Sequence, residues 1–280
     1  MIQPALLRTV RAELKKAIKE DAPKGDITSI ATVPAGSISS GVVVAKEEMV
    51  LAGLTVFREV MKIVDEKVVV KLLAKDGERV KRGTEVIRIS GRSRSLLKGE
   101  RVALNYLQRM CGTATATSKF VERVKSTKAK ILDTRKTTPN MRLLEKYSVR
   151  CGGGFNHRFS LTDAPLIKEN HIVAAGSIAN AVKGLKKVGA KPIILEVTNR
   201  REVLEGLEAK ADILLLDNMT PAKVKDMVKL IAGKALVEVS GGVNLKNVKS
   251  YALAGADRIS IGSITHSVPS SDLSLLFENL

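Results

Sequence analysis

Polar residues recur at the ends of successive apolar segments in the second half of the chain, and this spacing constrains the fold most. Glu196, Asp217, Ser240 and Gly262 each follow an apolar run, and they are separated by 21, 23 and 22 residues. One strand and one helix fill about that length, which predicts parallel βα units. The four positions should therefore share the carboxyl-end rim of a closed α/β barrel, where active sites lie.

The punctuation between the apolar runs supports this barrel. Ser177 is placed to cap a helix that Gly189 ends, and Thr220-Pro221 opens another that Gly233 ends. The pattern predicts strands within 129–135, 164–170, 191–199, 211–219, 235–243 and 257–265, with a shorter one near 157–161.

The first half of the chain follows a different pattern. Residues 1–20 have an amphipathic helical period, residues 36–91 are rich in short Val/Ile runs, and residues 94–126 are helical with an interruption at Gly112-Thr113. The β-rich stretch has no lysine in a hairpin tip, which excludes a swinging-arm carrier. We therefore predict an N-terminal β-sandwich-plus-helices (α/β-sandwich) domain over 1–110 and a barrel over 111–265, and leave open whether the tail 266–280 packs back on the first domain.

Composition limits the classes of partner. The net charge is +18, which fits a lysine-rich surface, heat adaptation or a polyanionic partner. Aromatic residues make up 3% with no Trp, so stacking platforms for nucleic-acid bases are scarce. We expect no nucleic acid, no membrane segment and, from two isolated cysteines, a reducing cytoplasm.

Chemistry at the rim divides into two kinds. Glu196 and Asp217 suit structural salt bridges, oxygen ligands for Mg²⁺ or acceptors for ribose hydroxyls. They could hold the metal directly, through water or through substrate. The glycine-rich ends expose backbone N–H groups that suit a phosphate. These phosphate candidates are Ser240, Gly241, Gly242, Gly262 and Ser263.

Cations are dense between residues 130 and 172, where they alternate with glycines and apolar runs. Cations at strand ends suit a small substrate with several negative charges. His157 is either such a ligand or a structural histidine, and His171 and His266 are expected either to be structural or to support the residues that contact substrate. The substrate candidates are Arg135, Lys136, His157, Arg158 and Lys168.

These residues carry a family resemblance. The segment 131–172, ILDTRKTTPNMRLLEKYSVRCGGGFNHRFSLTDAPLIKENHI, closely resembles the signature of the quinolinate phosphoribosyltransferases, also called nicotinate-nucleotide pyrophosphorylases (carboxylating). Departures from the family pattern fall at Asn140-Met141, Pro165 and Val239. The likeness continues in order through EDAPKGDITS, GERVALNYLQRMCGTAT, LEVTN, LLLDNM, VSGGV and SIGSITHS.

The resemblance implies a type II phosphoribosyltransferase architecture and a homodimer with shared active sites, with a hexamer left open. It implies transfer from phosphoribosyl pyrophosphate to quinolinate with decarboxylation, giving nicotinate mononucleotide, pyrophosphate and CO₂ in NAD biosynthesis, with Mg²⁺ as cofactor. Arg101 resembles an arginine contributed by the neighbouring subunit. The implied catalytic residues are Lys136, Lys168, Glu196 and Asp217.

Three alternatives remain at this stage. A molybdenum-transport-associated paralogue and a nicotinate phosphoribosyltransferase share the fold, whereas a basic nucleic-acid-binding module explains the charge. The two cationic motifs, TRKT and NHR, favour a dicarboxylate substrate and so disfavour both of these relatives. Carboxylates at two adjacent strand ends would repel a phosphodiester chain, which disfavours the third class.

Overall fold

The computed structural model describes residues 4–278, and it divides into two compact units. The first unit comprises the residues up to 118, residues 138–153 and those from 267 on. The second comprises residues 119–137 and 154–266. This division differs from the boundaries suggested by the sequence, because residues 111–118 and 138–153 belong to the first unit.

The first unit is built on a four-stranded antiparallel sheet. The strand order is β12-β1-β5-β3, and a separate two-stranded sheet joins β2 and β4. The tail contributes β12, which pairs along β1 from Gly41 with Phe277 to Ala45 with Leu273. The elements are α1 (Pro4–Asp21), α2 (Ile27–Thr32), β1 (Ile38–Ala45), β2 (Met49–Val50), α3 (Leu54–Val64), β3 (Val69–Leu72), β4 (Arg79–Val80), β5 (Glu85–Arg92), α5 (Arg142–Cys151), β12 (Leu273–Phe277) and most of α4 (Ser93–Val124).

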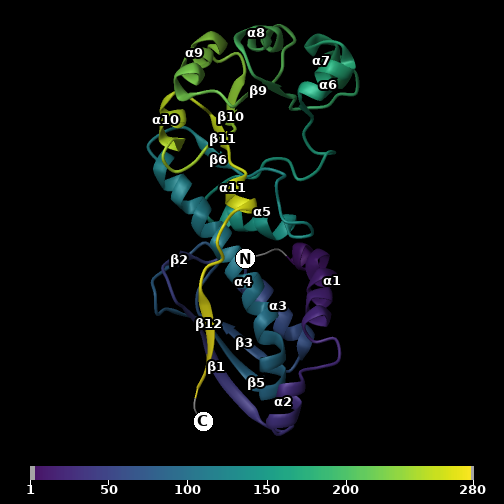
Figure 1. Ribbon diagram of the computed structural model, residues 1–280, viewed down its shortest axis with the longest axis vertical. Helices are drawn as coiled ribbons and strands as arrows, with labels where there is room; N and C mark the ends of the chain where they lie inside the picture. Colours follow the sequence, from purple (N-terminus) through teal and green to yellow (C-terminus); the bar gives the residue numbers. More distant parts are fainter. Residues whose placement is uncertain (1–3, 279–280) are drawn as a thin grey trace. The chain divides into compact units, whose positions relative to one another are not determined.

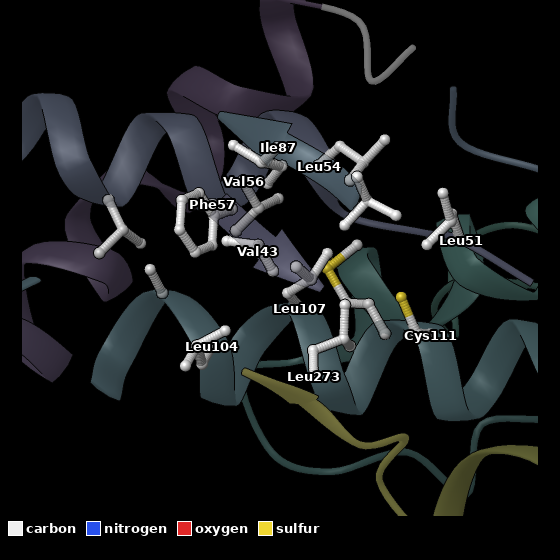
Figure 2. Packing of buried hydrophobic residues seen from close by; sticks show 14 of the residues in the cluster. Val43, Leu51, Leu54, Val56, Phe57, Ile87, Leu104, Leu107, Cys111 and Leu273 are labelled. Atoms are coloured by element: carbon white, nitrogen blue, oxygen red, sulfur yellow. The ribbon is translucent and has the colours of Figure 1, made fainter. Parts of the chain in front are cut away.

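Helices α1, α3 and α4 bury their apolar faces together with this sheet (Figure 1). Phe57 of α3, Leu104 and Leu107 of α4, and Val43 of β1 are each no more than 2% exposed. Figure 2 shows their side chains directed into one core, with Leu273 of β12 beside them. Each fully buried side chain of this size contributes about 1.5–3 kcal/mol, so the core holds sheet and helices together.

Two of the three expectations for the first half need revision. Residues 1–3 of the predicted first helix lie outside the described residues, but α1 otherwise matches it. Helix α3 lies within the stretch predicted to be β-rich. Helix α4 runs through Gly112-Thr113 without a break. The glycine serves a close approach instead, since a Cβ on Gly112 would lie 2.2 Å from the carbonyl oxygen of Pro269.

The second unit is a barrel-like α/β domain, as the strand spacing predicts. Its six parallel strands follow the order β7-β8-β9-β10-β11-β6, and Phe155 adds a parallel bridge to Leu132 of β6. Helices α6 to α10 contact one another in chain order along the strands (Figure 1). The elements are β6 (Lys130–Leu132), β7 (Leu166–Ile167), α6 (Glu169–Ala175), α7 (Ile178–Lys187), β8 (Ile194–Val197), α8 (Arg200–Glu208), β9 (Ile213–Asp217), α9 (Pro221–Ile231), β10 (Leu236–Ser240), α10 (Val248–Leu253), β11 (Arg258–Ser260) and α11 (Ser263–His266).

Local signals placed most of these elements correctly. Ser177 and Thr220 accept hydrogen bonds from backbone N–H groups in the first turns of α7 and α9, which confirms both caps. The described residues 157–161 form no strand, because Asp163 instead accepts bonds from the backbone N–H groups of Phe159 and Ser160. None of the described helices is both long and apolar enough to cross a membrane.

Candidate active site

A cavity of about 650 Å³ opens at the carboxyl ends of the parallel strands in the second unit. It gathers every candidate residue of the sequence analysis except Arg101. The candidates that line it are Arg135, Lys136, His157, Arg158, Lys168, Glu196, Asp217, Ser240, Gly241, Gly242, Gly262 and Ser263.

The two-residue period of β-strands explains how the cavity is built. Side chains two positions apart on a strand point to the same side. Accordingly, Leu215 and Asp217 of β9 both line the cavity, as do Glu238 and Ser240 of β10. The last residue of each pair forms the rim, and the residue two positions earlier forms a deeper layer. Leu166 of β7 with Lys168 just after it, and Ser260 of β11 with Gly262 just after it, follow the same spacing.

Three cations, Arg135, Lys136 and Arg158, line the cavity beyond β6. Burial, and then repulsion by Arg135, lower the pKa of the Arg158 guanidinium from its ordinary value. Arg158 donates through Nη1 to the carbonyl oxygen of Ala164 at 3.2 Å, and Thr265 Oγ1 donates to the carbonyl oxygen of Lys136 at 2.7 Å. Two guanidinium groups that repel each other form a site that an anion would stabilise.

The acidic side of the cavity consists of Glu196 and Asp217. Lys168 Nζ lies 2.8 Å from Glu196 Oε2, so the lysine after β7 pairs with the acid at the end of β8. Burial, followed by repulsion from Glu196, raises the pKa of the Asp217 carboxyl above its ordinary value. Glu196 is therefore paired with a cation inside the cavity, whereas Asp217 lies close enough to Glu196 for the two carboxylates to repel each other.

Asn218 fixes the carboxylate of Asp217 and packs on the glycine turn of the next strand. It has a φ of 53° and donates from Nδ2 to Asp217 Oδ2 at 2.7 Å. Its backbone N–H donates to the carbonyl oxygen of Ser240 at 2.9 Å. A Cβ on Gly241 would lie 2.1 Å from Asn218 Oδ1, so only glycine fits there. The turn places the Gly241 and Gly242 backbone at the cavity wall.

A buried ionic cluster lies in the deeper layer. Glu238 is fully buried, with Oε1 2.9 Å from His157 Nε2 and Oε2 2.9 Å from Arg258 Nε. Ser260 Oγ donates to Glu238 Oε1 at 2.5 Å. The ring nitrogen Nε2 of His157 is therefore engaged by a protein carboxylate. Its predicted contact with substrate stays a prediction and must use another atom of the residue.

Several cavity residues escaped the sequence analysis. His266, expected to be structural or to support the substrate ligands, lines the cavity itself. Glu238 had a signal of its own, since an acidic residue inside the apolar run ALVEVS lies two positions before Ser240 and must face the same side. The other polar residues missed are Thr134, Asn218 and Ser260.

Arg101 belongs to the first unit, where its side chain is exposed on α4. The cavity is lined by residues of the second unit, so the proposed service of Arg101 to a neighbouring subunit stays a prediction.

The donor set fits a magnesium ion that substrate helps to bind. Among the described residues, no group of three or more His, Cys, Asp or Glu side chains could hold a metal ion by itself. Mg²⁺ usually takes one or two carboxylates and completes its shell with water and substrate phosphates. Glu196 and Asp217 could supply that number of carboxylates.

Two family models and the relatives named below point to the same family. The model of the quinolinate phosphoribosyl transferase N-terminal domain matches residues 26–111, and that of the C-terminal domain matches residues 113–276. A probable nicotinate-nucleotide pyrophosphorylase [carboxylating] of Archaeoglobus fulgidus is 42% identical over 260 residues, covering 90% of this chain and 98% of that protein. One from Bacillus subtilis is 39% identical over 269 residues, covering 94% and 93%.

A solved structure has the same fold over nearly the full length. The nicotinate-nucleotide pyrophosphorylase of Francisella tularensis is 39% identical and superposes with a TM-score of 0.94, covering 99% of this chain and 98% of that one. Identity at this level over both domains, together with the cavity described above, leaves one assignment. The chain belongs to the quinolinate phosphoribosyltransferase family.

Proposed function

We propose that this protein transfers the phosphoribosyl group of phosphoribosyl pyrophosphate to quinolinate and decarboxylates the product, which yields nicotinate mononucleotide in NAD biosynthesis. The observation that carries this proposal is the composition of one cavity. Guanidinium and ammonium groups, two carboxylates and two glycine turns line the same cavity, and the ammonium group of Lys168 pairs with Glu196. A dianionic aromatic acid and a sugar phosphate would each find complementary groups.

The aromatic dianion is assigned to the cationic side. Arg135 and Arg158 can each offer a planar pair of N–H donors to a carboxylate, whereas Lys136 and Lys168 act as point charges. Lys168 already pairs with Glu196, so a substrate carboxylate near it would compete with Glu196 for the ammonium group. Leu166 and Leu215 in the deeper layer supply apolar surface for a ring.

The sugar phosphate is assigned to the other side. Backbone N–H groups after β10 and β11, at Gly241, Gly242 and Gly262, would receive the 5′-phosphate. Asp217, held by Asn218, and Glu196 would accept hydrogen bonds from ribose hydroxyls and support the positive charge that develops on the sugar.

The chemistry needs no covalent bond to the enzyme. The pyridine nitrogen forms a bond to the anomeric carbon as the bond from that carbon to pyrophosphate breaks, and both electrons leave with pyrophosphate. The ring nitrogen is then cationic. The bond between the ring and its neighbouring carboxylate breaks to release CO₂, the electron pair stays on the ring carbon next to the cationic nitrogen, and a proton completes the product. Lys136 and Lys168 would stabilise the anionic groups during these steps.

Mg²⁺ belongs to the proposal through Glu196 and Asp217. When bound, it would neutralise charge on the pyrophosphate that leaves. A shared-site homodimer, with Arg101 reaching a neighbouring subunit, and a cytoplasmic location are also proposals. The choice between dimer and hexamer stays open.

The test is a reconstituted reaction. Purified protein is incubated with quinolinate, phosphoribosyl pyrophosphate and Mg²⁺, and nicotinate replaces quinolinate in the control. CO₂ and nicotinate mononucleotide should form only with quinolinate, and chelation of Mg²⁺ should stop turnover. Product from nicotinate without CO₂ would instead favour a nicotinate phosphoribosyltransferase.

A further inference from the structure

The segment that carries His157 and Arg158 is held on the barrel by two carboxylates, one just after β6 and one within β10. The backbone N–H of His157 donates to Asp133 Oδ1 at 2.8 Å, and Asn156 Nδ2 donates to Asp133 Oδ2 at 2.6 Å. Asp133 follows β6, whereas Glu238, which contacts the imidazole, lies in β10. Because β11 lies between β6 and β10, the segment is fixed at points on both sides of one strand.

The contact with Glu238 fixes the orientation of the imidazole ring. Burial raises the pKa of Glu238, but the hydrogen bond and charge of His157, the charge of Arg258 and the hydrogen bond from Ser260 outweigh it, so that the pKa lies below its ordinary value. An ionised carboxylate only accepts hydrogen bonds, so His157 Nε2 must carry a hydrogen. With that nitrogen directed at Glu238, the ring has one orientation relative to the cavity.

Glu238 lies in the deeper layer of the cavity wall, and its surroundings argue against direct contact with substrate. Glu238 is 0% exposed, and its two oxygens face His157, Ser260 and Arg258. An anion at this depth also opposes binding of a dianion, so its presence needs a reason other than contact with substrate. Holding His157, which is 8% exposed at the cavity wall, supplies that reason.

We propose that Glu238 is a positioning residue for the dicarboxylate half of the site, acting through the ring of His157. The inference rests on the proposed function, because it assumes that His157 and Arg158 meet the aromatic acid. It predicts that loss of the Glu238 charge selectively weakens binding of the aromatic acid. The residues on β8, on β9 and in the glycine turns that are proposed to bind the sugar phosphate should keep their positions.

The test is a double-mutant cycle between Glu238→Gln and His157→Ala. Loss of a hydrogen bond to a charged group predicts a rise of about 10- to 100-fold in the KM for quinolinate in Glu238→Gln. The KM for phosphoribosyl pyrophosphate should change less than about 3-fold. If Glu238 acts through His157, adding Glu238→Gln to His157→Ala should raise the quinolinate KM by less than about 3-fold more.

Two further variants protect the test. Ser260→Ala removes the hydrogen bond from Ser260 to Glu238 Oε1, and it serves in place of Glu238→Gln if that variant does not fold. It should raise the KM for quinolinate by less than Glu238→Gln does, and this rise should be absent in the His157→Ala background. Glu205→Gln removes a partly exposed carboxylate on α8, which pairs with Arg201 outside the cavity, and should leave both KM values unchanged. With only three histidines in the chain, the imidazole NMR signals can be assigned, and only that of His157 should shift strongly in Glu238→Gln.

The outcomes separate the two proposals. Absence of turnover in the wild-type protein with quinolinate would sink the proposed function. If the wild type is active, additive effects of Glu238→Gln and His157→Ala would overturn the positioning role. Equal rises in both KM values, with a lowered Tm, would overturn it as well, because they would mark Glu238 as structural only.

Discussion

The glycine pair after β10 gives the sharpest test of the site geometry. Both residues have positive φ, +91° at Gly241 and +61° at Gly242, but only one faces an obstacle. A Cβ on Gly242 meets nothing within 4 Å, whereas one on Gly241 would lie 2.1 Å from Asn218 Oδ1 and 2.9 Å from Asn218 N. Gly242→Ala is therefore a matched control for Gly241→Ala.

The expected losses follow from these contacts. Gly242→Ala places alanine in the left-handed region, at a cost of about 1–2 kcal/mol. Gly241→Ala bears at least that cost and also displaces Asn218. That displacement breaks the bond to Asp217 Oδ2 and strains the one to the Ser240 carbonyl oxygen, for a total of about 3–5 kcal/mol. At about 2–4 °C per kcal/mol, the Tm should fall by about 10 °C in Gly241→Ala and about 4 °C in Gly242→Ala.

Calorimetry and steady-state kinetics would measure both variants. The KM for phosphoribosyl pyrophosphate should rise at least about 10-fold in Gly241→Ala, since Asp217 loses its partner. Quinolinate binding, followed by titration calorimetry, should stay close to wild type in both variants. Equal losses of Tm in the two variants would refute the argument, because the contact with Asn218 would then have no energetic consequence.

Three other expectations follow from described contacts. Asn218→Gly keeps the backbone at φ 53° but removes the amide that binds Asp217 Oδ2, so the KM for phosphoribosyl pyrophosphate should rise about 10-fold while the Tm falls by less than in Gly241→Ala; an unchanged KM would contradict this role for the amide. If Arg101 serves a neighbouring subunit, a mixture of inactive Arg101→Ala and Lys136→Ala proteins, denatured and refolded together, should recover about a quarter of wild-type activity, whereas each variant refolded alone should recover none. Burial raises the pKa of the Cys111 thiol to about 12, so the reactive thiolate should be scarce at pH 8 and iodoacetamide should label Cys111 only on unfolding; rapid labelling of native protein at pH 8 would contradict that burial.

The rim of the site was predictable because strand chemistry is local. An apolar run followed by Glu196 or Asp217 identifies a strand end, and parallel strands bring their ends to one edge. The deeper layer follows from the same two-residue period. Applied to the residues two positions before Ser240 and Gly262, it finds Glu238 and Ser260. The alternation of side chains along β10 and β11 therefore contains the signal for both residues.

Other features depend on contacts that local patterns do not contain. Helix α3 is not one of these features, because its buried residues Phe57, Val60 and Met61 recur at helical spacing in the sequence itself. Gly112 usually weakens a helix, yet it lies in unbroken α4 because the Pro269 carbonyl approaches it. The pairing of Asn218 with Asp217 needs a left-handed backbone that the letters Asp-Asn-Met do not reveal.

The pairing of β12 with β1 has a consequence for biosynthesis. Leu273 to Phe277 are synthesised more than 200 residues after the strand that they cover. A ribosome that has completed the N-terminal sheet residues still holds a chain with an open edge at β1, which is a template for wrong strand pairing. The first unit to begin synthesis should be the last to reach its native sheet, and loss of the last eight residues should cause aggregation of the nascent protein.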